Sequence, residues 1–397
     1  MAPTCIFCPT VLSERTKPEH ILLNALGGRR TTRTAICDHC NNLFGSTIDD
    51  DLAKMVLPIR NMLGMRSGKG KKAPSISTVD ASGRRLVLMH GGQPKNADKP
   101  YSVDIESSGA RNIKVYADPD RDLEAIIPHI AAEAGYTTEE IRQHLANAEA
   151  RLVSQPVDTV HGRLSFGKIG SQRAMMKACL ILWSEKVGNA ELQKSNYQSA
   201  KDFVLSGSSP ERGESDHEGL HICQLDTRKL PNNTPLAEEY GPCFNSIFVG
   251  SNESGRVVGF YSVHNAIGWW FVLAESGGPP KLKIAIASNP LDPKVHSVDG
   301  GTSFEVNWIE SAKAETAEVR ERIISIHQTY QEKARSSELE KIINGSLKNH
   351  GIKEGDLITE AVLHEISHRA VHLLLRMPSE RPLTKEELHH LLGKKND

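Results

Sequence analysis

Hydrophobic and polar residues follow different patterns along the chain, and the changes of pattern divide it into four regions. In the first, residues 1–66, an apolar run at helical spacing predicts a helix over 42–63. This helix should end or kink near Pro58, because proline removes a backbone hydrogen bond. The apolar positions of the run are Leu43, Phe44, Ile48, Leu52, Met55, Val56 and Ile59. In the second region, 67–78, glycines and lysines indicate a flexible linker or a phosphate-contacting arm.

The third region, 79–306, mixes short strands and helices. Strands are expected at 85–89 and 112–116, and helices near 121–135, 138–152, 171–187 and 194–205. From 236 to 306, apolar and aromatic runs between Gly, Asn and Ser turns predict antiparallel strands. Within them, Trp269-Trp270-Phe271 could stack on unpaired bases, but such a dense apolar run is more typical of a buried strand. In the fourth region, 307–397, helices are expected over 311–343 and 357–376, so the fold class is α+β.

Composition is that of an ordinary water-soluble protein. The chain has 397 residues, of which 38% are hydrophobic, enough for two or three domains. No apolar run is long enough to span a membrane, and no signal peptide precedes residue 30, so we expect a cytoplasmic protein without a membrane partner. The net charge is −1, yet the first 72 residues carry eleven Lys or Arg against six Asp or Glu. Any basic binding surface is therefore expected near the N-terminus.

Two Cys-x-x-Cys pairs stand in the first region. They are Cys5 with Cys8 and Cys37 with Cys40, and the chain's other three cysteines are scattered, which argues against a disulfide framework. Zinc prefers four such ligands in a tetrahedron. The spacing therefore predicts a structural zinc site, which would staple a segment too short to build a stable core unaided.

A second polar group accompanies the cysteines. Glu19-His20 lies between the two pairs, and Asn41 directly follows the second pair. Phosphodiester hydrolysis needs a general base beside a metal ligand set. An imidazole is largely available as a base at neutral pH, and the oxygens of Glu19 and Asn41 suit Mg²⁺ or Mn²⁺ better than zinc.

At these residues the chain resembles the HNH endonucleases, or ββα-metal nucleases, and among them the members with a four-cysteine zinc knuckle. The resemblance covers about residues 1–60. It implies a zinc-bound, treble-clef-like nuclease module in which Glu19 is a metal ligand, His20 is the general base and Asn41 is the last metal ligand. The pair Gly27-Gly28 resembles the family's hairpin loop, while Gly45 and Asp49 stand where some members carry a glycine and an acid.

One departure from the family pattern concerns the middle asparagine, which usually precedes the second knuckle and braces the base. Thr31, Thr32 and Thr34 occupy that stretch, and the hydroxyl of Thr32 or Thr34 is the expected substitute for orienting His20. Basic side chains nearby are candidates for contacts with nucleic-acid phosphates. They are Arg29, Arg30 and Arg33 in the hairpin and Lys69, Lys71 and Lys72 in the second region.

A competing motif lies near the other end, at His364-Glu365-Ile366-Ser367-His368. On a helix this spacing is the zinc-binding arrangement of metalloproteases. Chance matches to so short a pattern occur in roughly a few per cent of chains of this size and composition, and no other protease feature accompanies it. The favoured interpretation is an amphipathic helix with its histidines and Arg369 in water. The apolar residues expected to face a core are Val362, Leu363, Ile366, Val371, Leu373 and Leu374.

The sequence therefore predicts a DNA endonuclease with structural zinc and a catalytic Mg²⁺ or Mn²⁺. Small nucleases attached to large unidentified regions resemble bacterial restriction and antiphage effectors. The C-terminal region would select substrate, assemble a homodimer or respond to a small-molecule activator. The alternative is a non-catalytic, zinc-stabilised factor that binds nucleic acid or protein.

Overall fold

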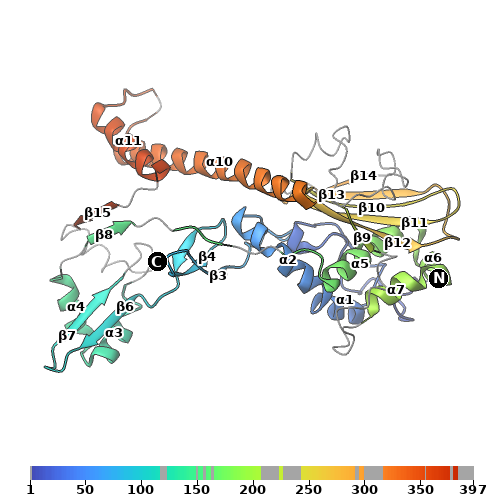
Figure 1. Ribbon diagram of the computed structural model, residues 1–397, viewed down its shortest axis with the longest axis horizontal. Helices are drawn as coiled ribbons and strands as arrows, with labels where there is room; N and C mark the ends of the chain where they lie inside the picture. Colours follow the sequence, from blue (N-terminus) through green and yellow to red (C-terminus); the bar gives the residue numbers. More distant parts are fainter. Residues whose placement is uncertain are drawn as a thin grey trace. The chain divides into compact units, whose positions relative to one another are not determined.

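The structure, a computed structural model, confirms the α+β fold class (Figure 1). It describes residues 2–116, 123–148, 151–154, 158–161, 165–206, 223–226, 243–290, 295–298, 316–353, 355–375 and 379–382. The chain divides into two compact units. The first contains Met1–Ile76, Leu88–Gln93 and Gly162–Lys333, and the second contains Ser77–Val87, Pro94–His161 and Ala334–Asp397. The boundaries of these units are not the region boundaries that the sequence suggested, after residues 66, 78 and 306. The N-terminal segment shares its core with residues far along the chain. No helix in the described ranges has the length and apolarity to cross a membrane.

An antiparallel sheet of six strands forms one layer of the first unit. The strand order is β14-β13-β10-β11-β12-β9. The strands are β9 (Cys223–Asp226), β10 (Asn245–Ser251), β11 (Val257–Val263), β12 (Ile267–Ala274), β13 (Lys283–Ser288) and β14 (Val295–Val298). Trp269, Trp270 and Phe271 lie in β12 with exposed fractions of 1%, 9% and 0%. The interpretation of this run as a buried strand is confirmed.

Helix α5 (Ile169–Val187) lies between this sheet and helix α2, and packs against both. Its residues are apolar on almost every side, as expected of a helix without a solvent face, and those from Gly170 to Ser184 are nearly all buried. After it come α6 (Asn189–Leu192), η2 (Ser195–Tyr197) and α7 (Gln198–Leu205), where the sequence predicted one helix over 194–205. Helix α5 lies at the centre of the core, and the N-terminal segment packs against it.

The N-terminal segment contains a short hairpin followed by two helices. Its elements are β1 (Glu19–His20), η1 (Asn24–Leu26), β2 (Thr31–Thr32), α1 (Asp38–Gly45) and α2 (Ile48–Met62). The predicted single helix over 42–63 with a break at Pro58 is wrong: the break comes at Ser46 and Thr47, and α2 continues through Pro58. The hydroxyls of Ser46 and Thr47 donate to the Leu43 carbonyl at 3.1 and 2.7 Å, replacing the amides of a further turn.

Two polar side chains of the sheet hold the hairpin loop. Asn245 Nδ2 donates to the Leu26 carbonyl at 2.8 Å, and Ser288 Oγ donates to the Gly27 carbonyl at 3.0 Å. Gly27 has φ +85°, and a Cβ there would lie 3.0 Å from the backbone of Pro290. The loop is thus fixed by residues more than 200 positions away.

The segment expected to be a flexible linker packs against the same loop. The backbone amides of Gly68 and Lys69 donate to the backbone and side-chain oxygens of Asn24 at 2.9 and 3.0 Å. A Cβ on Gly68 would lie 1.8 Å from the carbonyl oxygen of Gly28, so only glycine allows this approach. Residues 67–71 therefore form an ordered basic turn beside the hairpin, with Ser67 and Lys71 joined backbone to backbone at 2.9 Å.

The second unit contains small sheets and helices. Its elements are β3 (Ile76–Val79), β4 (Arg85–Leu88), β5 (Pro94–Asn96), β6 (Tyr101–Ile105), β7 (Arg111–Val115), α3 (Ile127–Ala134), α4 (Thr138–Ala146), β8 (Arg151–Ser154), α11 (Glu360–Leu375) and β15 (Ser379–Pro382). Helix α10 (Thr316–Asn349) has residues in both units. The helix expected over 138–152 ends at Ala146, and 151–154 pairs with β15 instead. The predicted helical character of the C-terminal region is confirmed by α10 and α11; residues 383–397 lie outside the described ranges.

Candidate nuclease and zinc site

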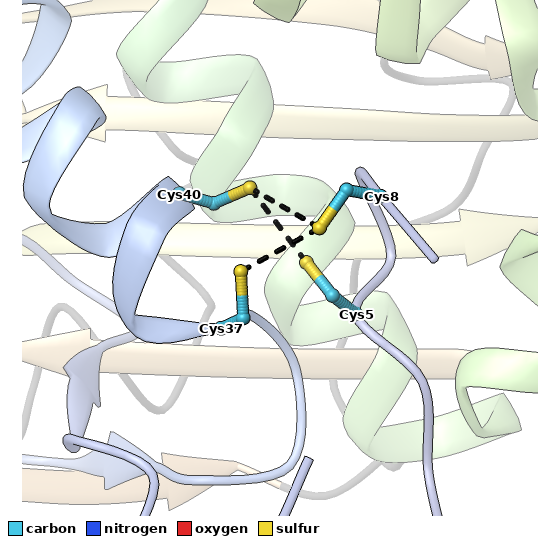
Figure 2. A group of neighbouring side chains, drawn as sticks. All are labelled: Cys5, Cys8, Cys37 and Cys40. Atoms are coloured by element: carbon cyan, nitrogen blue, oxygen red, sulfur yellow. Dashed lines mark hydrogen bonds between the residues drawn. The ribbon is translucent and has the colours of Figure 1, made fainter. Parts of the chain in front are cut away.

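The sulfur atoms of Cys5, Cys8, Cys37 and Cys40 converge on one point (Figure 2), and all lie within 4.8 Å of one another. The Cys5–Cys40, Cys8–Cys37 and Cys8–Cys40 sulfur pairs are 3.8, 3.5 and 3.8 Å apart. A tetrahedral zinc with bonds of about 2.3 Å holds its sulfur ligands about 3.8 Å apart. The cluster therefore has the size and the soft donor set that zinc requires.

Backbone contacts build this cluster from both ends of the segment. The amide of Cys5 donates to the Thr10 carbonyl at 2.8 Å, closing the first knuckle, and Cys37 is the N-cap of α1. Asn189 of α6 donates to the carbonyls of Thr4 and Thr34 at 2.5 and 2.6 Å, so one side chain holds both knuckles. The larger region thus takes part in shaping the zinc site.

Four thiols this close perturb one another. The hydrogen bond between Cys5 and Cys40 lowers the pKa of Cys5 to about 5 against the effect of burial, and it raises the pKa of Cys40. Burial raises the pKa of Cys8. Because four adjacent thiolates repel one another, full deprotonation of this set requires a cation at its centre.

Glu19 and His20 form β1, paired in antiparallel register with Thr32 and Thr31 of β2. Successive residues of a strand point to opposite faces, so the two side chains leave the hairpin in different directions. Glu19 is 7% exposed and points to the helical core, whereas His20 is half-buried. The hairpin that the resemblance implied is present.

The Glu19 carboxylate meets two charged residues that the sequence did not connect with it. Lys177 of α5 donates from Nζ to Glu19 Oε1 and to Asp49 Oδ2, both at 2.6 Å. Burial raises the pKa of Glu19, Asp49 adds to this effect, and Lys177 opposes it. Burial by itself would lower the pKa of Lys177, but the two carboxylates outweigh it and the pKa lies above its usual value. The three groups form one buried ionic cluster.

The surroundings of His20 favour the neutral form of its imidazole. Its pKa is lowered by burial, then by the positive charges of Lys69 and Lys177, while the backbone of Gly28 acts in the opposite direction. A lowered pKa keeps the ring neutral and able to accept a proton at neutral pH. Its Nδ1 atom is buried and has no hydrogen-bond partner among the described residues.

The threonines expected to orient His20 are engaged elsewhere. Thr32 Oγ1 lies 2.6 Å from Glu185 Oε1 on α5 and 3.0 Å from Thr34 Oγ1. This expectation is wrong, because the Thr32 side chain leaves β2 on the face of the hairpin opposite the base. Among the described residues, no side chain takes the place of the middle asparagine.

Asn41 lies in the first turn of α1, half-buried, with its amide bonded to the Cys37 carbonyl at 2.9 Å. Its side chain makes no hydrogen bond within the described part of the chain, and the Lys177 ammonium binds Oε1, not Oε2, of Glu19. The amide oxygen of Asn41 and Oε2 of Glu19 are hard oxygen donors suited to Mg²⁺ or Mn²⁺. The structure brings Glu19 together with Lys177 and Asp49, and gives no contact between Glu19 and Asn41.

The comparison with protein families matches the segment that contains this site. Residues 5–57 match the HNH endonuclease family. The N-terminal segment is an HNH endonuclease domain. Comparisons with curated proteins and with solved structures gave no match. The domain implies nuclease activity and nucleic-acid binding, and it comprises both knuckles, the hairpin, α1 and most of α2.

The basic residues around the HNH domain fall into two groups. Arg30 pairs with Glu185 at 3.3 Å, and Arg33 donates to the Thr16 carbonyl at 2.6 Å, so both help to hold the fold. The other candidates have exposed side chains without a partner among the described residues, and they are Arg29, Lys69, Lys71 and Lys72. These four are free to contact phosphates.

The competing metalloprotease motif lies on α11, outside the HNH domain. Glu365 accepts from Ser346 at 2.9 Å, pairs with His350 at 2.8 Å and bonds Arg369 at 3.3 Å. His364 and His368 are exposed, and the only His, Cys, Asp or Glu cluster of metal-binding size in the described ranges is the four-cysteine one. Val362 is buried and Ile366 is half-buried, as the amphipathic interpretation expects. Leu363 and Val371 were expected on the same apolar face, but they are 51% and 45% exposed, so that part of the expectation is wrong. Glu365 joins α11 to α10 through Ser346.

Sequence reasoning missed Lys177, Asn245 and Glu185, which all lie outside the HNH domain. Lys177 left a signal: it is the one cation within the apolar stretch 174–183, and a buried lysine needs an acidic partner. The sequence offered no means of identifying Glu19 and Asp49 as those partners. Asn245 and Glu185 left no such signal, because polar residues at a strand start and a helix end are usually in water.

Proposed function

We propose that this protein is a metal-dependent endonuclease that hydrolyses DNA phosphodiester bonds with His20 as the general base. The observation that carries the proposal is the match of residues 5–57 to the HNH endonuclease family. Three features add support: Glu19 and His20 are adjacent on the hairpin, His20 has a lowered pKa, and the side-chain amide of Asn41 makes no hydrogen bond with the described residues.

In this proposal His20 accepts the proton of the water that attacks phosphorus. Glu19, through Oε2, and Asn41, through its amide oxygen, hold the catalytic cation. When bound, Mg²⁺ or Mn²⁺ supplies the positive charge that stabilises the transition state and the departing 3′ oxygen. The exposed cations Arg29, Lys69, Lys71 and Lys72 bind the phosphate backbone, and the four cysteines hold a structural zinc.

We also propose a biological setting. A small nuclease domain within a larger chain suits a bacterial restriction or antiphage effector, in which the remaining residues select substrate or regulate cleavage. A homodimer would cut both strands efficiently. A small-molecule activator and a cytoplasmic location complete the proposal, and the seven free cysteines are consistent with a reducing compartment.

A second candidate function is favoured by the ion pair of Glu19 with Lys177. A carboxylate already paired with an ammonium group has less charge to offer a metal ion. In that case the segment would be a zinc-stabilised factor that binds nucleic acid or protein without cleaving it.

A plasmid-nicking assay separates the two candidates. Wild-type protein with Mg²⁺ or Mn²⁺ should nick supercoiled DNA, and His20→Ala should abolish nicking while leaving DNA binding intact. His39→Ala is the matched control, because His39 is an exposed imidazole in the second knuckle of the same domain. The endonuclease proposal fails if wild type binds DNA but does not cleave it with either metal, or if His20→Ala cleaves as fast as wild type.

A further inference from the structure

The ionic cluster at Glu19 is set deep in the first unit. Lys177 is 2% exposed, and its two partners Glu19 and Asp49 are 7% and 8% exposed. They come from three elements, α5, β1 and α2. The ammonium also lies 5.6 Å from the ring centroid of Phe44. Because α5 is packed on all sides, Lys177 has no room to swing away, and it is a permanent part of the site.

The negative charges of this cluster outnumber its positive charge. Two carboxylates and one ammonium leave a single net negative charge, and Lys69 adds a positive charge near His20. Each carboxylate also gives only one oxygen to Lys177: Oε1 of Glu19 and Oδ2 of Asp49. The second oxygen of Glu19 keeps a fixed direction, but little negative charge attracts a divalent cation to it.

Weakly charged sites of this kind suit a cation that is shared with the substrate. Mg²⁺ commonly binds through one or two carboxylates together with substrate phosphates, and keeps several waters. At this site the phosphodiester itself would bring the missing negative charge.

We propose that Lys177 is a positioning residue that couples cation binding to substrate: it anchors Glu19 and cancels the charge of one carboxylate, so that the divalent cation binds tightly only with a nucleic-acid phosphate. The inference rests on the proposed nuclease function. It places the control of the HNH domain on a helix more than 100 residues beyond the matched segment.

Mn²⁺ binding by the zinc-loaded full-length chain tests this role, measured calorimetrically with and without a short DNA duplex in the His20→Ala background. In that background, DNA should tighten Mn²⁺ binding by about tenfold or more. Lys177→Met should tighten binding without DNA by a similar factor, because two uncompensated carboxylates then face the cation. Asp49→Asn should weaken it.

The double variant Lys177→Met/Asp49→Asn separates charge from anchoring. It carries the wild-type net charge, so in the His20→Ala background its Mn²⁺ affinity should stay within about threefold of that of the parent. In the chain with His20 intact, the kcat of the double variant for nicking should fall at least tenfold, because Glu19 has lost its anchor. Lys177→Arg should largely keep both. Arg173→Met is the matched control, since Arg173 is a buried cation of the same helix bound to the Val204 carbonyl at 2.8 Å.

Each outcome decides the question. Unchanged or weaker Mn²⁺ binding in Lys177→Met overturns the charge role, and wild-type kcat in the double variant overturns the anchoring role. If Lys177→Met does not fold, Asp49→Asn and the double variant carry the test, and equal Mn²⁺ affinity in these two overturns the charge role. Absence of nicking by wild type would refute the nuclease proposal alone, because the Mn²⁺ measurements do not require cleavage.

Discussion

Replacing Asn245 by alanine should weaken the attachment of the hairpin to the sheet. The side chain is fully buried and joins two chain segments: Nδ2 donates to the Leu26 carbonyl at 2.8 Å, and Oδ1 accepts from the His264 amide at 2.9 Å. Alanine would leave both backbone groups buried without a partner. Leu26 and His264 are 0% and 1% exposed, so water does not reach them without a rearrangement.

The size of the effect follows from these two groups. An unsatisfied buried donor or acceptor costs about 1–3 kcal/mol, so the pair should lower the free energy of unfolding by about 2–6 kcal/mol. The loop that Asn245 holds lies between His20 and β2. Nicking activity should therefore fall together with stability, even though Asn245 lies far from the HNH domain in the sequence.

Urea unfolding of the zinc-loaded protein, followed by tryptophan fluorescence, measures this loss, because Trp183, Trp269 and Trp270 all lie in the first unit. Asn252→Ala is the control. Asn252 is a half-buried residue just beyond the other end of β10, and its side-chain oxygen accepts within its own turn, from the Ser254 hydroxyl at 2.8 Å and the Arg256 amide at 2.9 Å. If Asn245→Ala unfolds within 1 kcal/mol of wild type, the reasoning from buried backbone groups is refuted.

Three further predictions concern metals and pH. Elemental analysis should find one zinc per chain, lost in Cys40→Ser, and the opposite result would show that the sulfur cluster binds no structural ion. The zinc content of His364→Ala should equal that of wild type; a drop would revive the metalloprotease motif. Burial, and then the charge of Arg60, lowers the pKa of His264 from 6.5 to about 4. Below pH 6.5 the unfolded chain therefore binds a proton at His264 that the folded protein does not bind, and this favours unfolding. The contribution of His264 to stability is complete above about pH 7 and falls by about 1 kcal/mol at pH 5.5. The urea midpoint should therefore fall between these two pH values. His264→Asn, in which asparagine tolerates the positive φ of 54°, should remove the part of this fall that comes from His264.

The sequence predicted the local chemistry better than the long-range packing. Cysteine spacing was sufficient to identify the zinc cluster, because knuckle geometry depends on a few neighbouring residues. The break between α1 and α2 was misplaced. Proline is a strong local signal, yet the hydroxyls of Ser46 and Thr47 ended α1 earlier. For residues 67–71 the sequence left a linker and a phosphate-contacting arm open, because the packing of this basic turn depends on the absence of a side chain at Gly68, opposite the Gly28 carbonyl.

The HNH domain does not contain all the residues that hold Glu19 in place, because Lys177 lies outside it. The matched segment contains both carboxylates of the ionic cluster, but their neutralising cation comes from α5. Two buried carboxylates without that cation would repel each other and lose the ordered position of Glu19. The loop carbonyls of Leu26 and Gly27 likewise depend on donors from the sheet. A metal-ligand geometry at Glu19 therefore requires the folded first unit, which makes this unit, and not the matched segment, the smallest structure in which the proposed chemistry can operate.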